Sequence, residues 1–347
     1  MKIFASDNNS GVHPRIFEAM QKANDGRAEA YGEDEWTAKA DASVKRHLGE
    51  HARSWFVFLG TAANVLGLKS LLKPWEAVIC AGGAHVHTDE CGAAEALVGC
   101  KLLLAESVNG KVCLDSCRKL LWPRSDVHHV YPRVLSITQS TECGTVYSLE
   151  ELKEIKKFCL ENDLYLHMDG ARISNAAAWL GVSLPELMGV SGVDVISFGG
   201  TKNGLMFGEM VVFLNPELGH DFPRVRKQNM QLLSKMRFLS AQFIEYLDSG
   251  LWLDNATLAN SMAILLHDLI KPLEHVKICF PVQSNAVFAR LPRKAVDSLL
   301  QKYLFYIIDE NDDPAYPPGW PMIRLMTSFN TSMEEVEELA RAIAESG

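Results

Sequence analysis

Three side chains in one stretch of the sequence have the types and spacing to do chemistry. Asp169 ends the apolar run LYLHMD, Arg172 follows three residues later, and Lys202 comes 33 residues after the aspartate, behind a second apolar run. An arginine presents a planar, bidentate cation that suits a carboxylate. An aspartate and a lysine so placed can hold the two ends of pyridoxal phosphate, one at the pyridine nitrogen and one at the aldehyde as an imine.

The elements around these residues follow a regular alternation. LYLHMD and the run Val193–Phe198 are typical of buried strands, and similar apolar runs precede the loops upstream. Helical patterns separate them, including a helix that the capping box of Ser148 and Glu151 opens. The alternation predicts an α/β fold with a mostly parallel sheet covered on both faces. Because ligands bind at the carboxyl ends of such strands, Asp169 and Lys202 are expected at one site.

A turn upstream offers a place for a phosphate. The apolar run Trp55–Leu59 leads into Gly60 and Thr61, which open the segment GTAAN before a helical pattern. Free N–H groups and the positive end of a helix bind anions well. Small residues at this turn also occur for packing alone, so the pentapeptide by itself is compatible with either interpretation.

Histidines in loops provide candidate acid–base groups. His85 lies in the loop AGGAHVHT, where its ring could stack on a flat cofactor or transfer a proton, although a loop histidine is more often simply solvated. Asp89 and Glu90 follow Thr88, and the pattern predicts that they occupy the first turn of a helix capped by that threonine. Their charge then has a structural explanation, and we do not expect them to be catalytic.

The composition excludes several classes of protein. With 347 residues, 48% hydrophobic and a net charge of −9, the chain has ordinary globular values, and its acidity argues against nucleic-acid or anionic-membrane partners. We see no signal peptide and no apolar run of about 18 residues. The eight cysteines form no CxxC pair, so we expect no metal site and reduced thiols in a cytoplasmic protein with a small-molecule ligand.

The composition changes after residue 214. The segment from Arg224 to Gln242 is basic and helical, and the helical pattern continues to about Leu269. Its charges could form a solvated face, or a subunit contact that brings Lys235 or Arg237 to a neighbour's anionic site. From about Val276 strands and helices alternate again. We expect a large α/β domain at residues 21–245 and a small α+β domain made of residues 1–20 and 246–347.

Taken together, the motifs SDN, GTAAN, AGGAHVHTDE, HMDGAR, GGTKNG and IRLMTSF resemble the L-threonine aldolases, in particular their low-specificity or phenylserine branch. The resemblance implies the aspartate-aminotransferase fold, with a seven-stranded sheet, and pyridoxal phosphate as cofactor. It implies Lys202 as the imine-forming lysine and Asp169 at the pyridine nitrogen. The other cofactor contacts that it implies are Gly60 and Thr61 at the phosphate, His85 stacked on the ring, and Arg172. The substrate carboxylate is expected to bind to Ser6, Arg172 and Arg324.

The same resemblance implies cleavage of L-threonine, L-allo-threonine or phenylserine to glycine and an aldehyde, in a homodimer or homotetramer whose active sites lie at the interface. The base is expected to be His85 or His128, with His129 as the neighbouring alternative. The chain has SDN where the family more usually has SDT, and Thr-Lys-Asn around the lysine. Other reactions on the same cofactor, β-elimination or transamination, and a cofactor-free binding protein are the alternatives.

Overall fold

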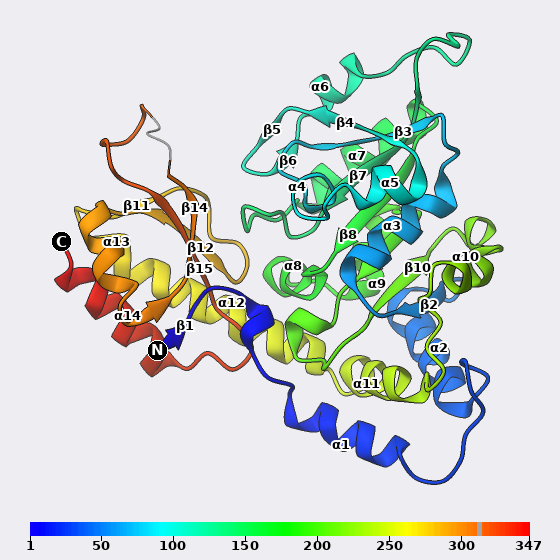
Figure 1. Ribbon diagram of the computed structural model, residues 1–347, viewed down its shortest axis with the longest axis horizontal. Helices are drawn as coiled ribbons and strands as arrows, with labels where there is room; N and C mark the ends of the chain where they lie inside the picture. Colours follow the sequence, from blue (N-terminus) through cyan, green and yellow to red (C-terminus); the bar gives the residue numbers. More distant parts are fainter. Residues whose placement is uncertain (311–313) are drawn as a thin grey trace.

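The structure, a computed structural model, describes residues 1–310 and 314–347. A large α/β body and a smaller C-terminal body lie side by side, and the long helix α12 (Leu251–Ile270) runs between them (Figure 1). Within the described residues, no helix has both the length and the apolar character needed to cross a membrane.

The large body is built on a seven-stranded sheet with the order β2-β10-β9-β8-β7-β3-β4. The pairs β3–β4, β3–β7, β7–β8 and β8–β9 are parallel, whereas β10 is antiparallel to both of its neighbours. The predicted mostly parallel sheet is therefore confirmed. The strands are β2 (Arg53–Val57), β3 (Glu76–Ala81), β4 (Lys101–Ala105), β7 (Tyr131–Thr138), β8 (Tyr165–Gly170), β9 (Val195–Phe198) and β10 (Glu209–Phe213).

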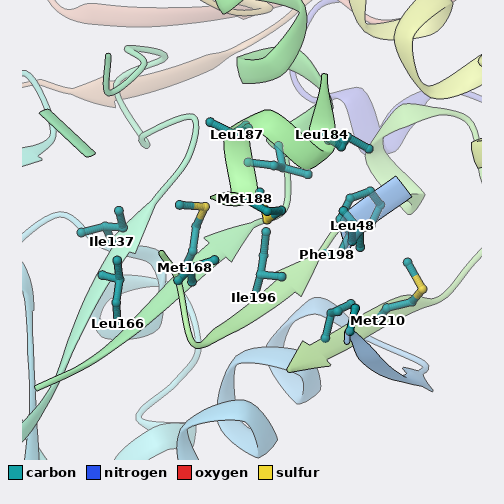
Figure 2. Close-up of a cluster of buried hydrophobic side chains, with 14 of the residues drawn as sticks. Leu48, Ile137, Leu166, Met168, Leu184, Leu187, Met188, Ile196, Phe198 and Met210 are labelled. Carbon is teal, nitrogen blue, oxygen red and sulfur yellow. The ribbon is translucent and has the colours of Figure 1, made fainter. Parts of the chain in front are cut away.

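Apolar side chains fill both faces of this sheet because consecutive strand residues point to opposite sides. Met168 and Ile196 pack on one face under helices from different parts of the chain (Figure 2), and Val195 and Val211 pack on the other. Burial on two sides explains why the strands appear in the sequence as continuous apolar runs. The first face is covered by α2 (Glu35–Leu48), α7 (Leu149–Glu161), α9 (Leu184–Ser191) and α11 (Arg237–Asp248), and the second by α3 (Gly60–Leu71), α5 (Ala93–Val98) and α10 (Phe222–Gln228).

Short elements complete the large body. They are η1 (Asp7–Asn9), α1 (Pro14–Ala23), α4 (His85–Thr88), β5 (Ser107–Val108), β6 (Lys111–Val112), α6 (Leu114–Lys119), α8 (Ile173–Leu180), η2 (Thr201–Asn203) and η3 (Pro216–Gly219). Helices α1 and α2 are amphipathic, and each buries residues at helical spacing, Ile16 and Ala19 on α1 and Ala40 and Val44 on α2. Helix α7 begins with the predicted capping box of Ser148 and Glu151.

The small body has its own four-stranded antiparallel sheet, in the order β11-β12-β15-β14, and a separate core. Phe4 belongs to that core, and the N-terminal strand β1 (Lys2–Ile3) pairs with β13. Such contacts are expected if the first residues of the chain contribute to the small domain. Helix α1 instead buries Ile16 in the core of the large body. The domain limits at residues 20 and 245 stay a prediction. The remaining elements are β11 (Lys277–Ile278), β12 (Ala286–Arg290), α13 (Arg293–Leu299), β13 (Tyr303–Leu304), β14 (Tyr306–Asp309), β15 (Met322–Met326) and α14 (Met333–Glu345).

Two local predictions were wrong. The basic segment is not one long helix but α10, α11 and α12, because Met230 and Gly250 adopt positive φ angles of 63° and 75° that a helix does not allow. No helix begins at Thr88; α4 ends there, and Glu90 lies between α4 and α5.

Candidate active site

A cavity opens at the carboxyl ends of β7, β8 and β9, and beside the loops after β2 and β3. It encloses about 530 Å³, including open solvent at its mouth. Six of the predicted site residues line it, from four separate segments of the chain: Gly60, Thr61, His85, Asp169, Arg172 and Lys202. The structure thus brings together most of the candidates that the strand-end rule selects.

Asp169 lies on β8 one residue before its end, level with Thr138 on β7 and Ser197 on β9. The residue is 7% exposed, and its two oxygens accept hydrogen bonds from the Ala171 backbone N–H (2.9 Å) and from the Asn64 amide (2.8 Å). These bonds hold the carboxylate in place at the strand end. A buried carboxylate in this position can hold a cationic ring nitrogen.

Lys202 lies in η2, two glycines after the end of β9, and its side chain is half-buried. The charge of Arg172 and then burial lower the pKa of Lys202, although Asp7, Asp169 and Glu209 oppose them. A lowered pKa increases the fraction of neutral amine, which is the nucleophilic form. The turn before the lysine needs glycine because a Cβ at Gly199 would lie 2.5 Å from the carbonyl oxygen of Ala171.

Helix α3 offers its N-terminus to the cavity through Gly60 and Thr61. Its first residue follows Leu59, and no side chain of the described residues caps the first N–H groups. These groups and the helix dipole can bind an anion such as a phosphate. A Cβ at Gly60 would meet nothing within 4 Å, so space for a ligand lies beside the turn.

His85 sits at the start of α4, and its surroundings include two residues that sequence reasoning missed. Its ring Nδ1 is 2.9 Å from Glu90 Oε1, and the Asn64 amide nitrogen is 2.8 Å from the same oxygen and 2.8 Å from Asp169 Oδ2. The ligand atoms of His85, Glu90 and Asp169 lie within 4.8 Å of one another, as in a metal site, but here an amide donor bridges the two carboxylates. Glu90 is 4% exposed, so the helix-cap explanation of its charge was wrong.

Arg172 is already paired in the structure. Its Nε and Nη2 donate to the two oxygens of Asp7 at 2.7 and 2.9 Å, and Asp7 in turn accepts from the Asn285 amide at 3.1 Å. Ser6 caps η1 by accepting from the Asn8 N–H and lies outside the cavity lining, beside the carboxylate that holds Arg172. In the SDN motif, it is therefore Asp7 that binds Arg172 directly.

Arg324 on β15 approaches the same region. Burial and then the charge of Arg172 lower the pKa of Arg324. Its Nη2 donates to the Ala5 carbonyl oxygen at 3.1 Å, while its Nε is buried without a hydrogen-bond partner. A buried, unpartnered donor on a cation is suited to an anionic ligand.

Two further carboxyl groups line the cavity without having been predicted. Glu142 accepts hydrogen bonds from the His85 backbone N–H (2.8 Å) and the Thr138 hydroxyl (2.7 Å), and burial raises its pKa. Glu209 accepts from the Gly200 N–H at 2.6 Å, and burial raises the pKa of Glu209 to about 7. No local motif marks either residue, because each reaches the cavity only through the strand order.

The structure does not bring His128 into this cavity. His128 is exposed and precedes β7, at the amino end of a strand whose other end reaches the site, and His129 stacks on Trp122. Strand polarity thus separates both histidines from Asp169 within one chain. Lys235 is exposed, and Arg237 donates to backbone carbonyl oxygens of Asp25 and Gly26.

Comparison with known proteins agrees with this geometry. The sequence profile of the beta-eliminating lyases matches residues 4–293. The chain is 45% identical to the low specificity L-threonine aldolase of Pseudomonas sp. (strain NCIMB 10558), over 98% of this chain and 96% of that one. A Leishmania major threonine aldolase structure superposes with a TM-score of 0.93 at 29% identity, covering 99% of both chains. An aromatic aminotransferase from Pyrococcus horikoshii shares the fold, with a TM-score of 0.70 at 16% identity over 99% of this chain and 94% of that one. The chain therefore belongs to the beta-eliminating lyase family and, within it, to the low-specificity L-threonine aldolases.

Proposed function

We propose that the protein cleaves L-threonine and related β-hydroxy-α-amino acids to glycine and an aldehyde, with pyridoxal phosphate as cofactor. The observation that carries the proposal is the meeting of Asp169, Lys202 and the uncapped N-terminus of α3 in one cavity. The 45% identity to a low specificity L-threonine aldolase over nearly the whole chain supports the choice of reaction.

The residues present fit that cofactor. Asp169 offers a carboxylate for the pyridine nitrogen, Lys202 an amine for the aldehyde, and Gly60 and Thr61 backbone donors for the phosphate. The pyridoxal phosphate ring, when bound, accepts the electrons of the bond that is broken at the substrate's α-carbon. Asp169 favours this by keeping a positive charge at the ring nitrogen.

Substrate binding is assigned to the two arginines. Asp7 occupies Nε and Nη2 of Arg172, which leaves Nη1 of that residue and the unpartnered Nε of Arg324 for a substrate carboxylate. Burial lowers the pKa of Arg324 most, and the charge of Arg172 lowers it further. The two cations therefore repel each other, and an anion between them relieves the repulsion. Ser6 then acts through Asp7 rather than by direct contact.

The base that removes the β-hydroxyl proton is assigned to His85. It is the predicted base that lines the same cavity as Lys202, whereas His128 could act only in the site of a neighbouring chain. A histidine suits this step because its pKa lies near neutral pH. Loss of that proton allows the Cα–Cβ bond to break, and the aldehyde leaves.

We also propose a cytoplasmic homodimer or homotetramer with the active site beside the interface. Phe58 and Leu59, which precede the phosphate-binding turn, are 40% and 56% exposed, and large apolar side chains at that position suit a protein contact. Lys235 remains the candidate that a neighbouring chain would offer to the phosphate.

One assay tests the reaction against its main rival. The beta-eliminating lyase profile favours β-elimination as the second candidate, which yields pyruvate and ammonia from an amino acid such as L-serine. We expect the purified protein, loaded with pyridoxal phosphate, to release glycine and aldehyde from L-threonine, L-allo-threonine or L-phenylserine. Pyruvate and ammonia without glycine would overturn the proposal in favour of the lyase.

A further inference from the structure

A chain of hydrogen bonds joins His85 to Asp169 through two residues with no assigned role. It runs from His85 Nδ1 to Glu90 Oε1 (2.9 Å), from that oxygen to Asn64 Nδ2 (2.8 Å), and on to Asp169 Oδ2 (2.8 Å). The Glu90 side chain is 0% exposed, whereas the His85 side chain is 39% exposed and faces the cavity. The chain thus leads from a buried carboxylate to an accessible imidazole ring.

The burial of Glu90 needs compensation. An ionised carboxylate without solvent is costly unless hydrogen bonds or opposite charges offset it. Among the described residues, Glu90 forms no ion pair with lysine or arginine; His85 and Asn64 donate to one oxygen, and Oε2 is buried without a partner. His85 is therefore the neighbour whose N–H, and whose charge when protonated, stabilises this carboxylate.

A donor at Nδ1 fixes the state of the ring. A carboxylate only accepts hydrogen bonds, so the neutral imidazole that faces Glu90 carries its proton on Nδ1 and leaves Nε2 as the acceptor. Asn64 presents its NH₂ group to two carboxylates and so holds Glu90 in place against the repulsion from Asp169.

We propose that Glu90 is a positioning residue that holds the proton of His85 on Nδ1 and orients the ring, so that Nε2 accepts the proton of the substrate's β-hydroxyl group. The second half of this statement rests on the proposed function, whereas the first half, the tautomer and orientation, does not.

Charges around His85 set the expected pH dependence. The hydrogen bond that His85 donates to Glu90 raises the pKa of His85, burial lowers it, Asp169 raises it, Lys202 lowers it, and the net shift is upward. Glu142 also lies nearby, accepting the backbone N–H of His85. Because the neutral ring is the base, kcat/KM rises as the pH passes upward through this pKa. Glu90→Gln removes the charge, lowers the pKa and moves that acidic limb to lower pH.

Kinetics of three variants test the role. We expect Glu90→Gln to lower kcat/KM for L-threonine by about 10²-fold, through kcat rather than KM, since the buried Glu90 side chain acts through His85. The acidic limb should move to lower pH, and Glu90→Asp should return it toward the wild-type position. Glu95→Gln, an exposed acid on α5, is the matched control and should change neither. If Glu90→Gln is active and the acidic limb of its pH profile does not move, Glu90 has only a structural role and the proposal is overturned.

A measurement without turnover tests the tautomer. In ¹⁵N-histidine-labelled protein, with and without pyridoxal phosphate, the His85 signals are assigned by their loss in His85→Gln. We expect a protonated Nδ1 and an unprotonated Nε2 above the pKa, with a lower midpoint in Glu90→Gln. The opposite tautomer would overturn the proposal even if the enzyme is active. Wild-type protein that shows the expected tautomer but releases no glycine would instead refute the proposed function.

Discussion

Replacing Asp7 by alanine tests whether the N-terminal segment builds the substrate site. The carboxylate is 1% exposed and binds both Nε and Nη2 of Arg172, whose side chain is 18% exposed. Burial alone would raise the pKa of Asp7, but the charge and hydrogen bonds of Arg172 outweigh it and the pKa is lowered. Asp7→Ala leaves a buried guanidinium without its counter-charge and close to Lys202.

The expected magnitude follows from this burial. Removing one partner of a buried ion pair costs about 3 to 5 kcal/mol, because the other charge remains desolvated. We expect that loss in the free energy of unfolding at pH 7, measured by urea denaturation with bound cofactor absent. Because the pKa of Asp7 is lowered in the folded protein, this carboxylate contributes its full stability only at a pH above the ordinary pKa of aspartate. The difference in the free energy of unfolding between wild type and Asp7→Ala should therefore shrink as the pH falls below about 4. With the cofactor present, kcat/KM for L-threonine should fall by about 10²-fold, since Arg172 loses its orientation.

A matched control separates this effect from the loss of any carboxylate. Glu337 and Arg341 form an exposed ion pair at 3.9 Å on α14. Glu337→Ala should cost less than about 1 kcal/mol. If Asp7→Ala destabilises the protein no more than this control, or leaves kcat/KM unchanged, the idea that Asp7 holds Arg172 for the substrate is refuted.

Three other changes have defined outcomes. Lys202→Ala should remove both the visible absorption band of the imine between lysine and cofactor and turnover; retention of both, measured by spectroscopy and glycine release, contradicts its role. Gly199→Ala should destabilise the protein by at least about 3 kcal/mol in urea denaturation, because its Cβ would lie 2.5 Å from a backbone oxygen, whereas Gly189→Ala, with nothing within 4 Å, should not. Burial lowers the pKa of His167 to about 4, so stability should fall by about 3 kcal/mol as the pH drops from 6.5 through 4. A pH series of urea denaturation curves checks this, and His167→Gln should flatten the slope; an equal slope would show that other groups cause it.

Local sequence patterns predicted the frame of the site. Apolar runs and capping residues identified the strand that carries Asp169, the strand that precedes Lys202, and the capping box that opens α7. Hydrophobic periodicity and helix caps are properties of a few consecutive residues, and the polarity of parallel strands then places their ends at one edge. The cofactor-binding half of the cavity could therefore be predicted without coordinates.

The partners of those residues could not. Glu90 has the sequence context of a helix cap, but α4 ends before it and the side chain turns inward to His85. Its neighbour Asn64 lies 26 residues earlier, and only the packing of α3 against the loop after β3 makes them meet. No short-range period encodes such a contact.

The sequence by itself thus determined which residues leave the carboxyl ends of the strands, and with them the fold, the site of Asp169 and Lys202, and the family. Only the tertiary structure decided what those residues contact. Arg172 binds Asp7, which is 165 positions away in the sequence, His85 forms a hydrogen bond with Glu90, and His128 lies at the opposite end of β7 from the cavity. The physical reason is that element type depends on neighbours along the chain, whereas side-chain pairing depends on the order in which strands and helices pack in space.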